Sequence, residues 1–105
     1  MGMAFESLRT EFLDYIAKTK RMSVHTVSAY RIDLMQFEDF LETQYVGSLA
    51  ECKAIHIRGF MAMLLDAGLT PRSVHRKVSS VRGWFKYLRR QGLMVGDPMS
   101  KVILP

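Results

Sequence analysis

Residues 69–92 read LTPRSVHRKVSSVRGWFKYLRRQG and carry the clearest helix signals in the chain. Thr70 is a good N-cap, and Pro71 stands at the first helical position, where its missing N–H removes no hydrogen bond. Gly92 is placed to end the helix. The spacing therefore predicts a helix over about Pro71 to Gln91 with one face turned to a core. Its apolar stripe comprises Val74, Val78, Val81, Phe85 and Leu88, with Trp84 packing at its edge.

The same stretch is strongly basic. Residues 70–92 contain seven Lys or Arg and no Asp or Glu, whereas the whole chain has 15 Lys or Arg, 10 Asp or Glu and a net charge of +5. The rest of the chain is therefore slightly acidic, and the positive field belongs to this helix. Such a distribution favours a polyanionic partner, nucleic acid above all.

The basic residues line one side of the predicted helix. Opposite the valine stripe, residues recur every three or four positions over ~30 Å, at about 1.5 Å per residue. The small side chains in the middle leave room for a phosphate or a base edge, or, at Gly83, for a neighbouring side chain. His75 and Arg82 flank this row. The row itself comprises Arg72, Arg76, Ser79, Gly83, Lys86 and Arg90.

Three further amphipathic helices are expected before this one. Ser23 is a good N-cap for the second, Gly68 ends the third, and Leu49 is expected to tuck inward from the connector between them. No strand pattern is present, so the chain is predicted to be an all-α, compact four-helix bundle. The expected ranges are about Ala4 to Lys18, Val24 to Thr43 and Ala54 to Ala67. The third helix is expected to bury Ile57, Phe60, Met61, Leu64 and Leu65.

The second helix has an unusual outer face, small and nearly uncharged at its N-terminal end. An exposed Ile32 beside small side chains suits a DNA groove, where apolar atoms meet thymine methyl groups. It suits a protein partner nearly as well. The face comprises His25, Ser28, Ala29, Ile32, Gln36 and Asp39.

Two stretches carry a resemblance to a known family. Residues 12–41 contain Ser-x-x-Thr-x-x-x-Tyr-x-x-Asp-x-x-x-Phe, and residues 57–88 place Gly-Leu-Thr before a basic helix that ends in Phe and Tyr. In order and spacing they resemble the N-terminal, SAM-like core-binding domain of tyrosine recombinases of the phage-integrase or Xer type. The matching positions are Ser23, Thr26, Tyr30, Asp33, Phe37, Phe60, Gly68, Leu69, Thr70, Ser80, Arg82, Phe85 and Tyr87, with Asp97-Pro98 similar to the Asn-Pro before the family's linker.

The resemblance implies a DNA-binding domain over residues 1–98 that holds one face of a duplex. Residues 99–105 would begin a linker to a C-terminal catalytic domain that this chain lacks. DNA recombination or integration is the implied process, with double-stranded DNA and further recombinase subunits as partners, in the cytoplasm and associated with the nucleoid. The family's tyrosine nucleophile lies in the catalytic domain, so no catalytic residue is expected here.

Other chemistries find little support in the sequence. Cys52 is the single cysteine, which excludes an internal disulfide. With His56, four residues on, it falls short of the three or four ligands of a zinc site. No phosphate-binding loop, Ser-His-Asp order, signal peptide or long apolar run is present. We therefore expect no metal, cofactor, small-molecule ligand, membrane contact or enzymatic activity in this chain.

The expected DNA contacts are of two kinds, to phosphates and to base edges. Cations of the fourth helix are expected at phosphates, and Arg72 and Arg76 also reach base edges together with the small second-helix residues. The alternative is a helical protein-interaction module, whose surface would more often mix charge signs and expose an apolar patch. The predicted contacts are His25, Ser28, Ala29, Ile32, Arg72, Arg76, Ser79, Arg82, Lys86 and Arg90.

A first prediction follows from the expected outward position of Arg76. Arg76→Ala is expected to weaken binding to duplex DNA while the domain keeps its thermal transition, because an outward cation contributes to binding and not to packing. DNA titration and a thermal melt of the same sample check both parts. Loss of the thermal transition would contradict the assigned face.

Overall fold

The computed structural model describes residues 4–104 and contains four α-helices and one short 3-10 turn. Between residues 4 and 104 there is no β-strand, and no helix is long and apolar enough to cross a membrane. The all-α prediction is confirmed, and the expected helix bounds hold to within one residue at each end. The elements are α1 (Phe5–Lys18), α2 (Val24–Thr43), η1 (Leu49–Glu51), α3 (Ala54–Asp66) and α4 (Pro71–Arg90).

The helix ends form as the local sequence predicts. The side chains of Ser23 and Thr70 each accept a hydrogen bond from the backbone N–H three residues on, at 3.1 and 3.2 Å. Gly68 and Gly92 follow α3 and α4 with φ of 96° and 71°, a conformation that favours glycine. These caps fix where α2 and α4 begin, and so which residues lie in their first turns.

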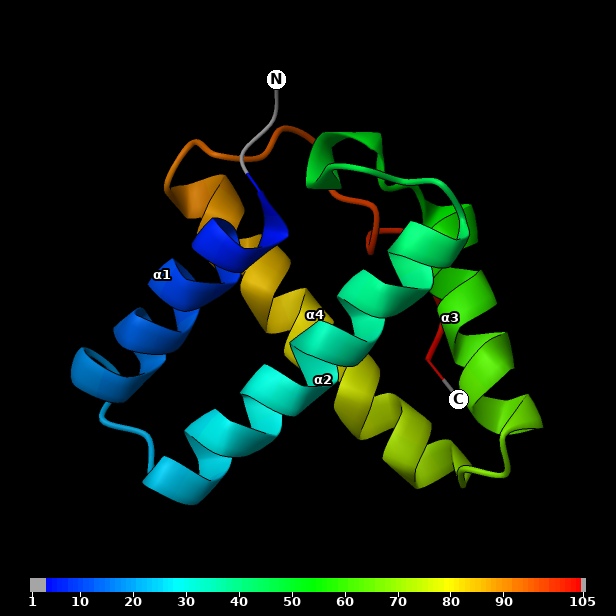
Figure 1. The fold of residues 1–105 in the computed structure, drawn as a ribbon, viewed down its shortest axis with the longest axis horizontal. Coiled ribbons are helices and arrows are strands. Elements are labelled where there is room, and N and C mark those ends of the chain that lie inside the picture. Colours follow the sequence, from blue (N-terminus) through cyan, green and yellow to red (C-terminus); the bar gives the residue numbers. More distant parts are fainter. Residues whose placement is uncertain (1–3, 105) are drawn as a thin grey trace.

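The four helices are arranged around a central pair. Helices α2 and α4 cross in the middle of the domain, with α1 on one side and α3 on the other (Figure 1). Beyond the crossing, the N-terminal halves of α2 and α4 diverge toward the lower edge of the view (Figure 1). Since α2 and α4 each contact all three other helices, the central pair determines how the domain is assembled.

An aromatic cluster joins α2, α3 and α4. The ring of Phe37 meets Phe60 and Phe85 edge to face, with centroids 5.2 and 5.9 Å apart. Trp84 is fully buried, and its Nε1–H donates to the carbonyl of Leu8 at 3.3 Å, which ties α4 to α1. The expectation that Trp84 serves in packing is therefore confirmed.

The predicted core is correct on α4 and partly wrong on α3. Every member of the α4 stripe is fully buried, and Leu49 of the connector is also buried, as predicted. The prediction for Leu65 is wrong, because its side chain is 41% exposed. The inward face of α3 is narrower than the apolar composition of that helix suggests. Its buried residues are Ile57, Phe60 and Leu64.

The segment after α4 packs against the domain. Met99 and Val102 are buried, and Arg58 of α3 donates to the carbonyl of Lys101 at 3.3 Å. In the upper part of Figure 1 this segment crosses from the end of α4 and then descends beside α3. The domain boundary at residue 98 remains a prediction, while the packed part of the described chain reaches Leu104, which is partly buried against the core.

Truncating the aromatic cluster is expected to destabilise the domain strongly. Phe85→Ala leaves a cavity among three helices and is expected to lower the free energy of unfolding by ~3–5 kcal/mol. Val95→Ala is the control, because Val95 is 97% exposed, and its effect should lie within about 0.5 kcal/mol. Urea unfolding of the variants measures both values; a near-neutral Phe85→Ala would show that the core is misplaced.

Candidate nucleic-acid interface

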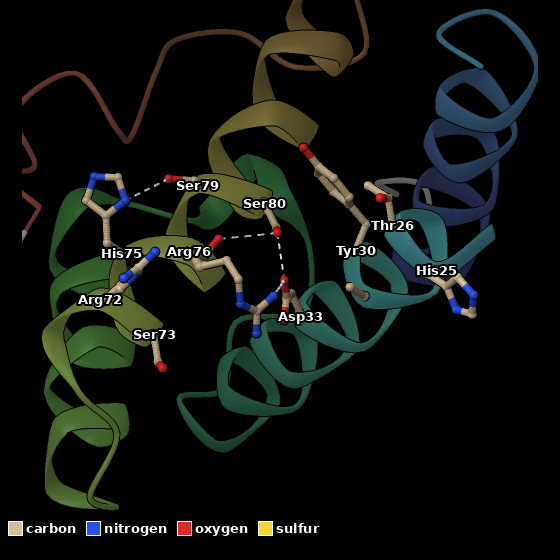
Figure 2. A pocket seen from close by; sticks show the side chains of 11 residues that line it. His25, Thr26, Tyr30, Asp33, Arg72, Ser73, His75, Arg76, Ser79 and Ser80 are labelled. Carbon is tan, nitrogen blue, oxygen red and sulfur yellow. Dashed lines mark hydrogen bonds and ion pairs between the residues drawn. The ribbon is translucent and has the colours of Figure 1, made fainter. Parts of the chain in front are cut away.

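A groove of about 1110 Å³ opens between the diverging halves of α2 and α4. It lies where the helix caps place the first turns of both helices, and side chains from α4 reach across it toward α2 (Figure 2). Because only two helices form its walls, the groove is open along its length. From α2 it is lined by His25, Thr26, Ala29, Tyr30 and Asp33, and from α4 by Arg72, Ser73, His75, Arg76, Ser79 and Ser80.

A buried carboxylate connects the two helices at this groove. Asp33 of α2 is only 1% exposed and accepts hydrogen bonds from three side chains of α4. Arg76 Nη1 donates to Oδ2 at 2.7 Å, Ser80 Oγ to Oδ2 at 2.7 Å, and Lys77 Nζ to Oδ1 at 3.0 Å. A buried charge requires such pairing, since an unpaired carboxylate would be strongly unfavourable there.

The two cations that bind Asp33 differ in exposure. The Lys77 side chain is 11% exposed and also donates to Gln36 Oε1 at 2.7 Å, so it belongs to the interior. The Arg76 side chain is 53% exposed and bridges from α4 to α2 (Figure 2). The expectation that Arg76 simply points outward is therefore wrong: its guanidinium lies at the surface but is bound to a buried partner.

The remaining walls of the groove are small or weakly polar. Ala29 faces it from α2, and Ser79 faces it from α4, with Ser79 Oγ 3.4 Å from His75 Nδ1. Arg72 is exposed one turn before Arg76. The wall of the groove therefore offers cations and hydroxyl groups beside short side chains, which allows close approach of a ligand.

The structure brings together half of the sequence-predicted contacts. His25, Ala29, Arg72, Arg76 and Ser79 line the groove. The other five lie outside it: Ser28 borders a separate hollow on α2, Ile32 is 47% exposed, and Arg82, Lys86 and Arg90 lie farther along α4.

Gly83 lies beside packed aromatic side chains. A Cβ at this position would lie 3.8 Å from both Phe12 and Tyr30. Of the two roles that the sequence leaves open, the structure favours room for neighbouring side chains. Gly83 also borders a second, smaller hollow that Lys86 and Arg90 line.

Four basic side chains on α4 have no acidic partner within the described residues. Arg76 and Lys77 are neutralised in part by Asp33, and Arg89 lies 3.5 Å from Asp97. The unpaired cations are all exposed, so they are the charges of α4 that are most available to a polyanionic partner. They are Arg72, Arg82, Lys86 and Arg90.

The sequence pattern did not lead us to predict Asp33 as a residue of the site. One signal was present: Val27, Tyr30, Leu34, Phe37 and Leu41 recur at helical spacing as the apolar stripe of the second helix, and Asp33 falls on the same face. An acidic residue on a core face needs a buried cation, and Lys77 falls on the core side of the basic helix in the same way. An ion pair between Asp33 and Lys77 could therefore have been predicted from the two helix patterns.

The surroundings of Cys52 and His56 indicate structural roles for both residues. Burial raises the pKa of the Cys52 thiol to about 12, so the reactive thiolate is scarce at neutral pH. His56 Nδ1 accepts the backbone N–H of Lys53 at 2.9 Å, which is a capping contact at the start of α3. Across residues 4–104, no three His, Cys, Asp or Glu side chains are grouped as a metal site requires.

Comparison with known families accounts for this arrangement. Residues 10–92 match the family described as phage integrase, N-terminal SAM-like domain. The chain belongs to this family. The match includes α2, α3, α4 and most of α1, and therefore both walls of the groove.

Relatives of this phage integrase N-terminal domain are tyrosine recombinases. The chain is 35% identical to the tyrosine recombinase XerC of Oceanobacillus iheyensis over 94 residues, covering 90% of this chain and 31% of the relative. It is 35% identical to the tyrosine recombinase XerD of Listeria innocua over 98 residues, covering 90% of this chain and 32% of the relative. The chain thus spans about a third of the length of the curated relatives that it matches.

A solved structure has the same fold as this N-terminal domain. It is the N-terminal domain of a phage integrase/site-specific recombinase from Haloarcula marismortui, with a TM-score of 0.87 and 15% sequence identity. The alignment covers all of this chain and 99% of that one. At this identity the likeness shows the fold alone.

Removing the buried carboxylate is expected to destabilise this phage integrase N-terminal domain. Asp33→Ala leaves Lys77 buried without its charge partner and is expected to lower the free energy of unfolding by ~3–5 kcal/mol. Arg76→Ala should cost less than about 1 kcal/mol, since Arg76 is half exposed and Lys77 remains on Asp33. Urea unfolding measures the free energy of unfolding of both variants. Equal losses would show that Asp33 stabilises the domain mainly through its contact with Arg76.

Proposed function

We propose that this chain is a DNA-binding domain of a site-specific tyrosine recombinase. The observation that carries the proposal is the outer face of α4, where Arg72, Arg82, Lys86 and Arg90 are exposed and have no acidic partner among residues 4–104. Such cations bind phosphates and release counterions from duplex DNA. The family match supports the same assignment, because its curated relatives are tyrosine recombinases.

The proposed contacts differ along α4. Arg72 lies in the groove beside α2, whereas Lys86 and Arg90 border a smaller hollow of about 170 Å³ together with Lys20. Because the helix is ~30 Å long, cations at its two ends would reach different phosphates of one duplex. Helices α2 and α4 would thus face the major groove with their N-terminal halves, and His25, Ser28, Ala29 and Ile32 would meet base edges.

Strand breakage and rejoining are proposed to belong to a separate catalytic domain. The matched relatives are about three times as long as the aligned segment. In this proposal the chain positions DNA, and further recombinase subunits complete the complex on the duplex. The affinity of this domain alone for DNA should be modest, since a second DNA-binding domain in the same protein would add avidity.

A protein-interaction module is the second candidate, and one observation favours it. Helix α3 exposes Ile55, Met63 and Leu65, at 69%, 40% and 41%. Scattered apolar side chains are common on protein surfaces, so this observation is weaker than the unpaired cations of α4. A stable protein complex formed by a chain without DNA affinity would favour this candidate.

The test is a titration of labelled duplex DNA at about 50 and 200 mM salt. Four phosphate contacts predict an affinity loss of ~100-fold between these concentrations. Lys86→Ala should weaken binding to all sequences and reduce the magnitude of the salt slope by about one. Lys53→Ala is the matched control, because Lys53 is exposed at the start of α3, away from the groove. A folded domain with no salt-sensitive affinity would overturn the proposal.

A further inference from the structure

We infer that Asp33 is a positioning residue that holds Arg76 to recognise a guanine base. The inference rests on the proposed DNA-binding function. It assigns different roles to two arginines that the sequence treats alike: Arg72 binds phosphate, and Arg76 reads a base edge.

The first step concerns the orientation of Arg76. Its Nη1 donates to Asp33 Oδ2 at 2.7 Å, while Lys77 and Ser80 hold the same carboxylate. Asp33 therefore cannot follow Arg76 if the arginine moves, and the guanidinium is anchored on a fixed support. Less side-chain freedom is lost when an anchored guanidinium binds a ligand, which favours directional contacts.

The second step concerns charge. Arg76 faces a carboxylate that is 1% exposed, so part of its charge is already compensated. Arg72, on the same wall of the groove, has no acidic partner among residues 4–104. Phosphate binding depends on charge and tolerates many orientations, whereas base recognition depends on the direction of N–H groups. Arg72 is accordingly the better phosphate contact and Arg76 the better base contact.

The third step identifies the base. A guanidinium has five N–H donors and no acceptor. Asp33 takes a bond from one Arg76 nitrogen, and the other donors make no further hydrogen bond within the described residues. In the major groove, guanine alone presents two acceptors, O6 and N7, and no donor, whereas adenine and cytosine present amino donors and thymine a single acceptor. The short side chains of Ala29 and Ser79 leave space for that edge.

Selection from duplexes with a randomised central segment tests the inference. The wild-type chain is expected to enrich guanine at a fixed position of the bound pool. Arg76→Lys keeps the charge but loses the two-pronged geometry, and should reduce the preference for that guanine by about tenfold. Arg72→Lys is the matched control and should leave the base preference unchanged.

A second variant tests the part played by Asp33. Asp33→Asn, confirmed to be folded by its thermal transition, should reduce the same guanine preference without lowering affinity for the randomised pool. A merely structural role would reduce both together. If Asp33→Asn does not fold, the comparison of Arg76→Lys with Arg72→Lys decides whether Arg76 reads the base.

The outcomes separate this inference from the proposed function. Wild-type binding to DNA without any guanine preference, or a preference unchanged by Arg76→Lys, overturns the inference and leaves DNA binding intact. A folded Asp33→Asn that keeps the full preference overturns the positioning role. No salt-sensitive binding by the wild-type chain overturns the proposed function itself.

Discussion

The carboxylate of Asp33 is the interaction on which the architecture of the interface depends. It is buried between α2 and α4 and accepts hydrogen bonds from Arg76, Lys77 and Ser80. A charge in this position is stable only if the two helices keep one relative register, because each donor must reach it. The same interaction therefore assembles the central helix pair and fixes the walls of the groove.

This constraint separates Arg76 and Lys77 from the other basic residues of α4. Lys77 is used inside the protein, and Arg76 is shared between the protein and the surface. Arg72, Arg82, Lys86 and Arg90 are exposed and unpaired within residues 4–104. The formal charge of the helix consequently overstates the positive field presented to a partner. The unpaired cations carry the proposed electrostatic attraction to DNA, and the anchored arginine carries the proposed discrimination between bases.

The packing on the opposite side of α4 explains how the helix bears so many cations. Its valine stripe, Trp84 and Phe85 are fully buried against the other helices. Burial of these side chains stabilises the domain by ~25 cal/mol per Å² of apolar surface removed from water. The outer face can therefore carry charges that repel one another, and Arg72 and Lys86 have no acidic partner in the described part of the chain. Packing and proposed binding are thus separated on two sides of one helix.

The sequence by itself determined the helices, their caps and the inner face of α4, because periodicity and capping act within about four residues along the chain. It also indicated five of the eleven residues that line the groove, three through the basic row and two through the outer face of the second helix. Only the tertiary structure decided that Asp33 binds Arg76, since these residues are 43 positions apart. Likewise, the burial of Lys77 and the packing beside Gly83 depend on which helices meet, and that depends on side-chain fit across the whole bundle.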